Sequence, residues 1–308
     1  MLAASLIGRA RLVVAVSLMI TYASGAVAHG FAGDRFFPAT ILTPDPFVAD
    51  EMSLPTAVIN PPSPDGSRAI DIEADLAKRI TPDLGLTLSH RWERLTVPDM
   101  PAVTGLGGAF SAELDYQVLL DAPHQALALL GVNTSFGHTG RVQALGAPDF
   151  TTISPVIDFG KGFGDLPESM PWLRPLAITG TLNFGFPTKT QSAGVPNPNT
   201  FNFGFSFQYS LEYLQHYVKD VGLSAPFDRL IPLVEVSFST AVNRGLGGQT
   251  VGTIQPGVIW FGQYVQIGAE AIIPASRLTG HGYGGVVQLH FYLDDLFSNS
   301  LGRPLLRW

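Results

Sequence analysis

The sequence predicts an all-β protein, a transmembrane antiparallel β-barrel of about twelve strands with short helices in its connections. Apolar and polar residues alternate with a period of two along most of the chain, in segments that mostly run for about nine to thirteen residues. Soluble strands usually have about 5–6 residues, whereas a tilted membrane strand needs about 9–11. The chain also has only four lysines, all at strand ends or in connections. A secreted β-sandwich would alternate similarly and is the alternative fold.

Residues 1–28 have the features of a secretory signal. Arg9 and Arg11 precede the apolar run Leu12–Ile20, and Ala26-Val27-Ala28 matches a small-x-small cleavage site. We expect cleavage before His29. The alternative is a membrane anchor, but nine apolar residues are too few to span a bilayer.

The composition limits the partners of the exported chain. Without Arg9 and Arg11, 16 basic residues face 25 acidic residues, a formal charge of −9. This balance argues against nucleic acid as a partner. There is no cysteine, so disulfides cannot contribute to stability.

Residues 29–52 follow the cleavage site and do not alternate. They combine proline, glycine and charged residues with Phe31, Phe36, Phe37 and Phe47. Such a segment could plug or line the lumen, lie along the periplasmic rim, or be a mobile tail. The four phenylalanines argue against full disorder.

The barrel is expected over residues 53–297, with a C-terminal tail at 298–308. Eleven alternating segments are visible, and bacterial barrels have an even number of strands, so "SLPTAVIN" is added as the first. The expected strands are 53–60, 69–76, 84–92, 110–119, 124–136, 151–160, 176–186, 201–213, 233–240, 251–261, 265–271 and 283–293.

The segment "FNFGFSFQYSLEY" at 201–213 gives the clearest alternation. Phenylalanine, tyrosine and leucine occupy every second position, and the positions between them are polar or glycine. A strand with these residues has one apolar face, which we expect to contact lipid.

The orientation follows from the lengths of the connections, because bacterial barrels have short periplasmic turns and longer outer loops. The periplasmic connections are expected at 78–82, 121–123, 161–174, 215–231 and near Gly262. The outer loops are expected at 61–67, 93–108, 137–150, 187–200, 242–250 and 274–282. Two periplasmic connections, 165–173 and 211–222, have a partly helical composition.

Three segments carry a resemblance to a known family: "HGFAGDRFFP", "DPFVADE" and "GFGDLPESMPWLRPLAITG". With the signal, they resemble a family of proteobacterial outer-membrane β-barrel proteins described as transporters linked to aromatic (meta-pathway phenol) degradation. The resemblance implies a barrel and the passage of small aromatic or hydrophobic compounds. It carries over no defined set of site residues.

The inward faces of the strands carry the candidate pore-lining residues. Every second residue of a barrel strand faces the lumen, which predicts nine inward carboxylates: Asp71, Glu73, Asp75, Glu113, Asp115, Asp158, Glu212, Glu235 and Glu270. Arg91 and His290 are the basic groups expected among them. An acidic constriction favours the passage of cations.

These carboxylates have an alternative role, because a packed polar interior would pair them. Asp71, Glu73 and Asp75 follow one another on one face at about 6–7 Å spacing. If 79–82 is a tight turn, Arg91 lies nearly opposite Asp71, and the two could form a structural salt bridge.

Three functions remain open. The first is a narrow outer-membrane channel for small solutes, and the second is a closed structural or partner-binding barrel. The third is a lipid-modifying enzyme at the cell surface, but the outward faces offer only His90 and His124 and no clear serine partner. We therefore expect no enzyme, no cofactor and no metal site. The expected partners are outer-membrane lipid of a Gram-negative cell, the barrel-assembly machinery and a small-molecule solute. The candidate signal for the assembly machinery is Trp308, with Phe291 and Phe297 as alternatives.

Overall fold

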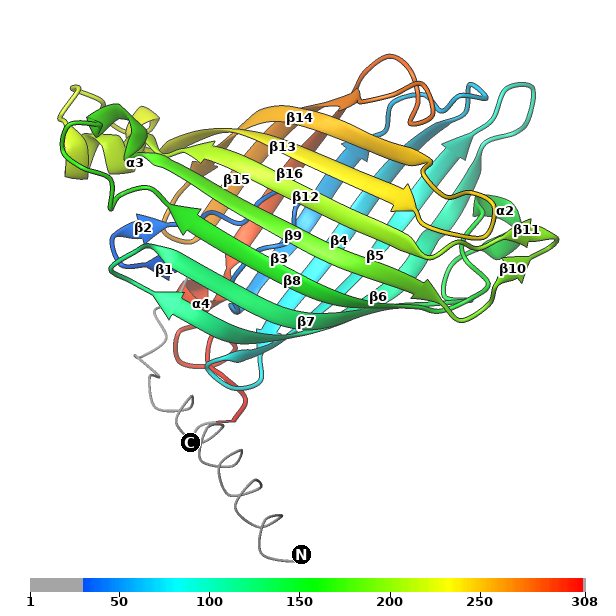
Figure 1. Ribbon diagram of the computed structural model, residues 1–308, viewed down its shortest axis with the longest axis horizontal. Helices are drawn as coiled ribbons and strands as arrows, with labels where there is room; N and C mark the ends of the chain where they lie inside the picture. The colour runs from blue at the N-terminus through cyan, green and yellow to red at the C-terminus, as the bar shows by residue number, and fades with distance from the viewer. Residues whose placement is uncertain (1–29, 307–308) are drawn as a thin grey trace, which may run out of the picture.

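The computed structural model describes residues 30–306, and in it twelve strands close into one antiparallel barrel (Figure 1). Each strand pairs with its neighbours in the chain, and β16 pairs with β3 to close the ring. The strands are β3 (Glu51–Ile59), β4 (Arg68–Arg79), β5 (Leu84–Thr96), β6 (Val103–Asp121), β7 (Ala126–Phe136), β8 (Thr152–Gly162), β9 (Leu176–Pro187), β12 (Thr200–Tyr209), β13 (Leu230–Ala241), β14 (Thr250–Phe261), β15 (Val265–Pro274) and β16 (Gly284–Tyr292). The predicted fold class is confirmed. The expected signal at 1–28 and Trp308 lie outside the described residues.

Strand β12 shows how the alternation becomes two faces. Phe207 is 47% exposed on the outside of the barrel, whereas Ser206 and Gln208, on the inside, are 0% and 2% exposed. Large apolar side chains are exposed on the other strands as well, among them Leu76 on β4 and Leu114 on β6. A closed barrel with an apolar exterior satisfies its backbone hydrogen bonds internally, as a membrane-spanning sheet must.

The expected strand at 201–213 is too long at its C-terminal end. β12 ends at Tyr209, and Ser210 begins the helical segment α3 (Leu211–Tyr213). The Ser210 hydroxyl accepts a hydrogen bond from the Tyr213 backbone N–H, as an N-cap residue does. This cap ends the strand although the alternation of residue types continues.

The two ends of the barrel differ in their connections. The end that carries the N-terminal segment, here called the inner end, has the short connections 80–83, 122–125 and 262–264. Its two longer connections contain η1 (Pro171–Leu173), α3, η2 (Leu214–Val218) and η3 (Phe227–Arg229). The opposite, outer end has six loops, which contain α2 (Val142–Leu145) and the small pair β10 (Gln191–Ser192) and β11 (Val195–Pro196) (Figure 1).

The outer loop expected at 93–108 is shorter than predicted. β5 continues to Thr96 and β6 starts at Val103, which leaves 97–102 as the loop. The first part of β6 contains Gly105, Gly107 and Gly108. Glycine has no side chain to mark a face, so the alternation cannot be read there.

Residues 30–50 lie inside the barrel near the inner end (Figure 1). They form the small hairpin of β1 (Phe31–Ala32) and β2 (Arg35–Phe36) and then an irregular chain. Phe36 packs against Phe261 and Tyr292 of the barrel wall, with ring centroids 4.7 Å and 6.4 Å away. Phe37 is fully buried and belongs to a second cluster with Leu127. The apolar core of the protein therefore lies within the lumen, between this segment and the wall.

A network of charged groups connects the end of this segment to the wall and the C-terminal tail. Asp50 accepts hydrogen bonds from Lys78 Nζ at 2.6 Å and from Arg79 Nε at 2.9 Å. Arg79 also forms an ion pair with Asp294, on α4 (Leu293–Leu296), at 3.0 Å. The Arg79 carbonyl accepts a hydrogen bond from the Leu305 N–H.

Within residues 30–306, no helix is long and apolar enough to cross a membrane.

Candidate functional site: the barrel lumen

The lumen contains two neighbouring cavities. The outer cavity has a volume of about 690 Å³ and the inner cavity about 300 Å³. Pro44, Ser111, Glu113 and Asn133 line both cavities. The two spaces therefore meet at the tip of the N-terminal segment, where Pro44 lies.

The outer cavity is lined mainly by short polar side chains of the strands. Asn202 donates a hydrogen bond to the side-chain oxygen of Asn183 at 2.7 Å, across the β9–β12 pair. The chain around α2 folds over this cavity, because Leu145 and Phe150 line it. This lining is the Ser, Thr and Asn surface that the polar faces of the strands predict.

The inner cavity is bounded on one side by the N-terminal segment and on the other by acidic strand residues. Glu73, Asp75 and Asp115 line it together with Asp45 and Glu51. Lys78 and His290 are its basic lining groups among the described residues. Carboxylates therefore outnumber basic groups along the inner cavity.

Asp71, Glu73 and Asp75 lie on the inward face of β4, but the predicted pairing of Asp71 with Arg91 is wrong. Arg91 lies opposite Glu73, and Asp71 lies opposite Glu93. The Arg91 guanidinium instead approaches the Glu93 carboxylate at 3.6 Å. The reason is the turn: β4 continues to Arg79 and β5 begins at Leu84, which shifts the register relative to a tight turn at 79–82.

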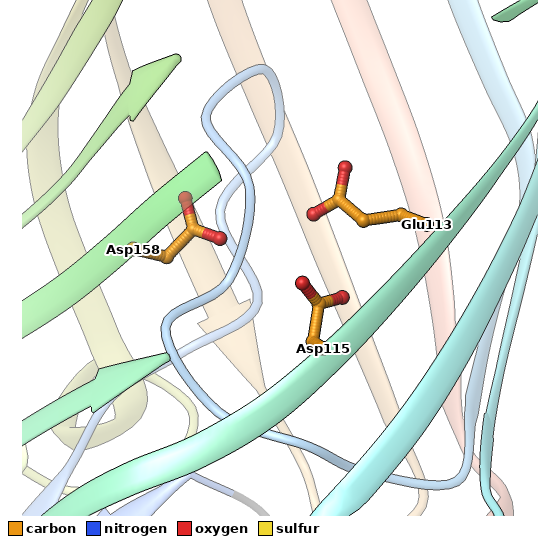
Figure 2. Close-up of side chains that lie close together, drawn as sticks. All are labelled: Glu113, Asp115 and Asp158. Atoms are coloured by element: carbon orange, nitrogen blue, oxygen red, sulfur yellow. The ribbon is translucent and has the colours of Figure 1, made fainter. Parts of the chain in front are cut away.

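Glu113, Asp115 and Asp158 come together across three strands. One carboxylate oxygen from each lies within 4.8 Å of the others (Figure 2). Glu113 and Asp115 are on β6 and Asp158 is on β8, with β7 between them. Gly131 of β7 lies opposite Asp115, and a Cβ there would be 1.9 Å from Asp115 Oδ1. The glycine therefore provides the space in which Asp115 reaches over β7.

Glu235 binds the backbone of the N-terminal segment. Its carboxylate accepts three hydrogen bonds, from the N–H groups of Ile41, Leu42 and Thr43, at 2.8, 2.9 and 2.7 Å. Glu235 is fully buried. Three consecutive backbone N–H groups therefore share this one side chain as their acceptor. Its role in this structure is therefore to anchor the segment.

Arg35 anchors the other part of the segment to the inner end. Its guanidinium donates to the carbonyls of Arg174, Pro175 and Leu176 at 2.6, 3.0 and 3.0 Å. It also lies over the Tyr213 ring, 4.1 Å from the centroid. Burial lowers the pKa of Arg35 to about 10, so the group stays charged at neutral pH.

The remaining candidates are placed as follows. Glu270 is buried on β15, and neither of its carboxylate oxygens has a hydrogen-bond partner among the described residues. His290 is buried on β16, with Ser53 Oγ 2.9 Å from Nδ1 and Glu51 Oε2 3.3 Å from Nε2. Glu212 lies on α3 in a connection at the inner end, so its assignment to an inward strand face is wrong.

The alternation of inward and outward positions did not predict all of the buried charged residues. Glu51 is at the start of β3, before the first expected strand, and Glu93 falls in the expected outer loop. Both are buried. A longer expected strand would have placed Glu93 on the inward face. Glu51 is separated from the inward residues Thr56 and Val58 by a shift of register between Ser53 and Thr56, which reverses the alternation. Arg35 and Asp50 gave no periodic signal, because they lie in or next to the irregular N-terminal segment.

No protein-family model matches the chain. No curated protein matches it either. Among solved structures, it is similar to a NanC porin, with a TM-score of 0.48 and 8% identity over 78% of this chain and 98% of that chain. It is also similar to the KdgM porin, with a TM-score of 0.46 and 8% identity over 78% of this chain and 98% of that chain. A third similar structure is OmpT of Vibrio cholerae, with a TM-score of 0.33 and 8% identity over 80% of this chain and 99% of that chain. The assignment of a twelve-stranded barrel rests on the strand pairing described above.

Proposed function

We propose that the protein is an outer-membrane channel for small solutes, with a preference for cations, whose inner half is narrowed by residues 30–50. The observation that carries this proposal is the pair of adjoining polar cavities in the lumen, about 690 and 300 Å³ in volume. The acidic lining of the inner cavity supports the preference for cations, because a low-dielectric wall focuses the field of its carboxylates onto a passing ion.

The mechanism is diffusion down a gradient, without covalent chemistry. A solute enters the outer cavity, passes Glu113 at the junction, and reaches Glu73 and Asp75 in the inner cavity. From there its passage depends on displacement of the N-terminal segment from Glu235. A twelve-stranded barrel lies between small filled barrels and the 16–18-stranded porins with wide channels, which supports a narrow path.

The apolar exterior of the barrel supports a location in the outer membrane, and the acidic interior supports a small solute as a partner. The barrel would reside in the outer membrane of a Gram-negative cell, in contact with lipid, after export and insertion by the barrel-assembly machinery. The family resemblance of the sequence adds small aromatic or hydrophobic compounds as candidate solutes.

A second candidate is a closed barrel with a structural or partner-binding role. It is favoured by the apolar packing of Phe36 and Phe37, which fills the inner half of the lumen with side chains.

Single-channel recording distinguishes the two candidates. The chain without residues 1–28 would be refolded and placed in a planar bilayer under a salt gradient, alongside a variant that also lacks residues 30–48. This deletion keeps Asp50 and its bonds to Lys78 and Arg79. We expect discrete cation-selective openings, and a conductance at least about threefold larger in the deletion variant, because the constriction is removed.

Two further variants test the acidic lining. Combining Glu73→Gln with Asp75→Asn is expected to reduce cation selectivity. The matched change Asp149→Asn, in an outer loop where Asp149 pairs with Lys189, is expected to leave selectivity unchanged. Silence from both the full and the deleted chain, with folding shown by heat-modifiable gel mobility, would reject the channel in favour of the closed barrel.

A further inference from the structure

We propose that Glu113, Asp115 and Asp158 bind a hard divalent cation, Ca²⁺, inside the barrel. The site would lie beside the junction of the two cavities, since Glu113 lines both and Asp115 lines the inner one. The proposal goes beyond the channel function and does not rest on it, because an ion can occupy the site whether or not the barrel conducts.

The spacing of the three carboxylates suits one ion. An oxygen from each lies within 4.8 Å of the others. Two oxygens on opposite sides of a Ca²⁺ ion are about 4.6–5.2 Å apart, twice the usual Ca–O distance. Around Mg²⁺ the corresponding separation is only about 4.0–4.2 Å, and its octahedral geometry is stricter. A separation of at most 4.8 Å therefore falls within the span that one Ca²⁺ ion allows between two of its ligands.

The burial and the hydrogen bonding of Asp158 provide an independent observation. Asp158 is 0% exposed, and neither carboxylate oxygen has a hydrogen-bond partner within 3.5 Å among the described residues, although the Thr181 hydroxyl is near enough to act on it. Figure 2 shows this carboxylate directed toward those of Glu113 and Asp115. A buried carboxylate without donors is costly unless a charge partner is present.

The protein supplies no such charge partner within residues 30–306. None of the three acids forms an ion pair with lysine, arginine or histidine there. Asp115 Oδ1 is also buried without a hydrogen-bond partner. In their ionised form three carboxylates this close repel one another, and a cation of charge +2 would stabilise that form.

The surrounding strands fix the ligands in place. Asn133 donates to Glu113 Oε2 at 2.7 Å, which orients that carboxylate and leaves Oε1 for an ion. Gly131 leaves the space that Asp115 occupies. Thr181 lies opposite Asp158 across the β8–β9 pair. An oxygen-only donor set without histidine or cysteine selects hard cations over Zn²⁺ or Cu²⁺.

Isothermal titration calorimetry tests the site on the refolded chain without residues 1–28. The protein would be stripped with a chelator in detergent and titrated with CaCl₂, and in parallel with MgCl₂. We expect one Ca²⁺ per barrel and weaker binding of Mg²⁺. The triple variant Glu113→Gln, Asp115→Asn, Asp158→Asn is expected to lose the Ca²⁺ heat, and Asp158→Asn alone to weaken binding at least about tenfold.

The controls separate loss of the site from loss of the fold. Asp65→Asn changes an exposed loop aspartate that bonds to Ser67, and it should bind Ca²⁺ like the unmodified chain. Heat-modifiable gel mobility shows whether each variant is folded. Absence of Ca²⁺ binding by the folded unmodified chain, retention of it by the folded triple variant, or Mg²⁺ binding as tight as Ca²⁺ would each overturn the proposal. Because calorimetry needs no current, a barrel that binds Ca²⁺ but is silent in a bilayer would support this site and reject only the channel.

Discussion

The inner and outer halves of the lumen have the same kind of wall but different contents. In the inner half, Phe36 and Phe37 of the N-terminal segment pack against the wall, and Arg35 bonds to three carbonyls. In the outer half, polar strand residues such as Asn183 and Asn202 surround a cavity of about 690 Å³. The alternation of the strands makes the wall, but the N-terminal segment decides where the lumen is filled.

The presence or absence of the N-terminal segment also determines which hydrogen-bond partners the inward polar side chains have. In the outer half Asn202 bonds to Asn183 on the adjacent strand. Toward the inner half, Glu235 and Gln266 bond to the backbone of the N-terminal segment. Removing an inward polar group should therefore cost more where its partner is buried backbone than where it faces the cavity.

The largest effect is expected for Glu235→Ala. It leaves the backbone N–H groups of 41–43 without an acceptor, at about 1–3 kcal/mol each. Because the cost of burying the carboxylate is removed at the same time, we expect a net loss of about 3–6 kcal/mol. The temperature of the heat-modifiable gel shift should fall, and trypsin should cleave after Arg35. Glu235→Gln keeps one acceptor oxygen and should give an intermediate result. A Glu235→Ala barrel as stable and as protease-resistant as the unmodified chain would show that the segment does not depend on this anchor.

A smaller effect is expected for Arg35→Ala, at about 2–3 kcal/mol, because three carbonyls lose a charged donor while the cost of burying the guanidinium is also removed. The gel-shift temperature measures it. Arg35→Lys keeps the charge but cannot donate in the same fork, so it should recover only part of the loss. Full recovery by lysine would mean that charge, rather than the guanidinium geometry, holds the hairpin of β1 and β2.

The smallest effects come from a matched pair of amides. Gln266, fully buried, donates to the Ala39 carbonyl at 2.6 Å and accepts from the Tyr292 hydroxyl at 3.0 Å. Gln266→Ala should cost about 1–3 kcal/mol, whereas Asn202→Ala in the outer half should cost less than about 1 kcal/mol. The gel-shift temperatures of the two variants compare the halves directly. Equal losses would contradict the distinction between a filled and an open half.

The residue pattern alone was sufficient for the architecture. A period of two over long segments predicts membrane strands, and the row from Phe201 to Tyr209 predicts an outward face, because side-chain direction in a strand depends only on local backbone geometry. The positions of the short connections also followed from the pattern. Where glycine replaces a side chain, as at 105–108, or where Ser210 caps a helix, the pattern misplaced the strand ends.

Only the tertiary structure decided which charged groups meet. The residue opposite Arg91 depends on the length of one turn: a shift of register replaces Asp71 by Glu73, and the guanidinium approaches Glu93. Glu113 and Asp158 are 45 positions apart in the chain and approach each other only because two hairpins place β6 and β8 on either side of β7. The contact of Glu235 with residues 41–43 joins a strand to a segment without periodicity. Such contacts depend on the register of neighbouring strands and on the packing of segments distant in the chain, which the alternation of residue types does not encode.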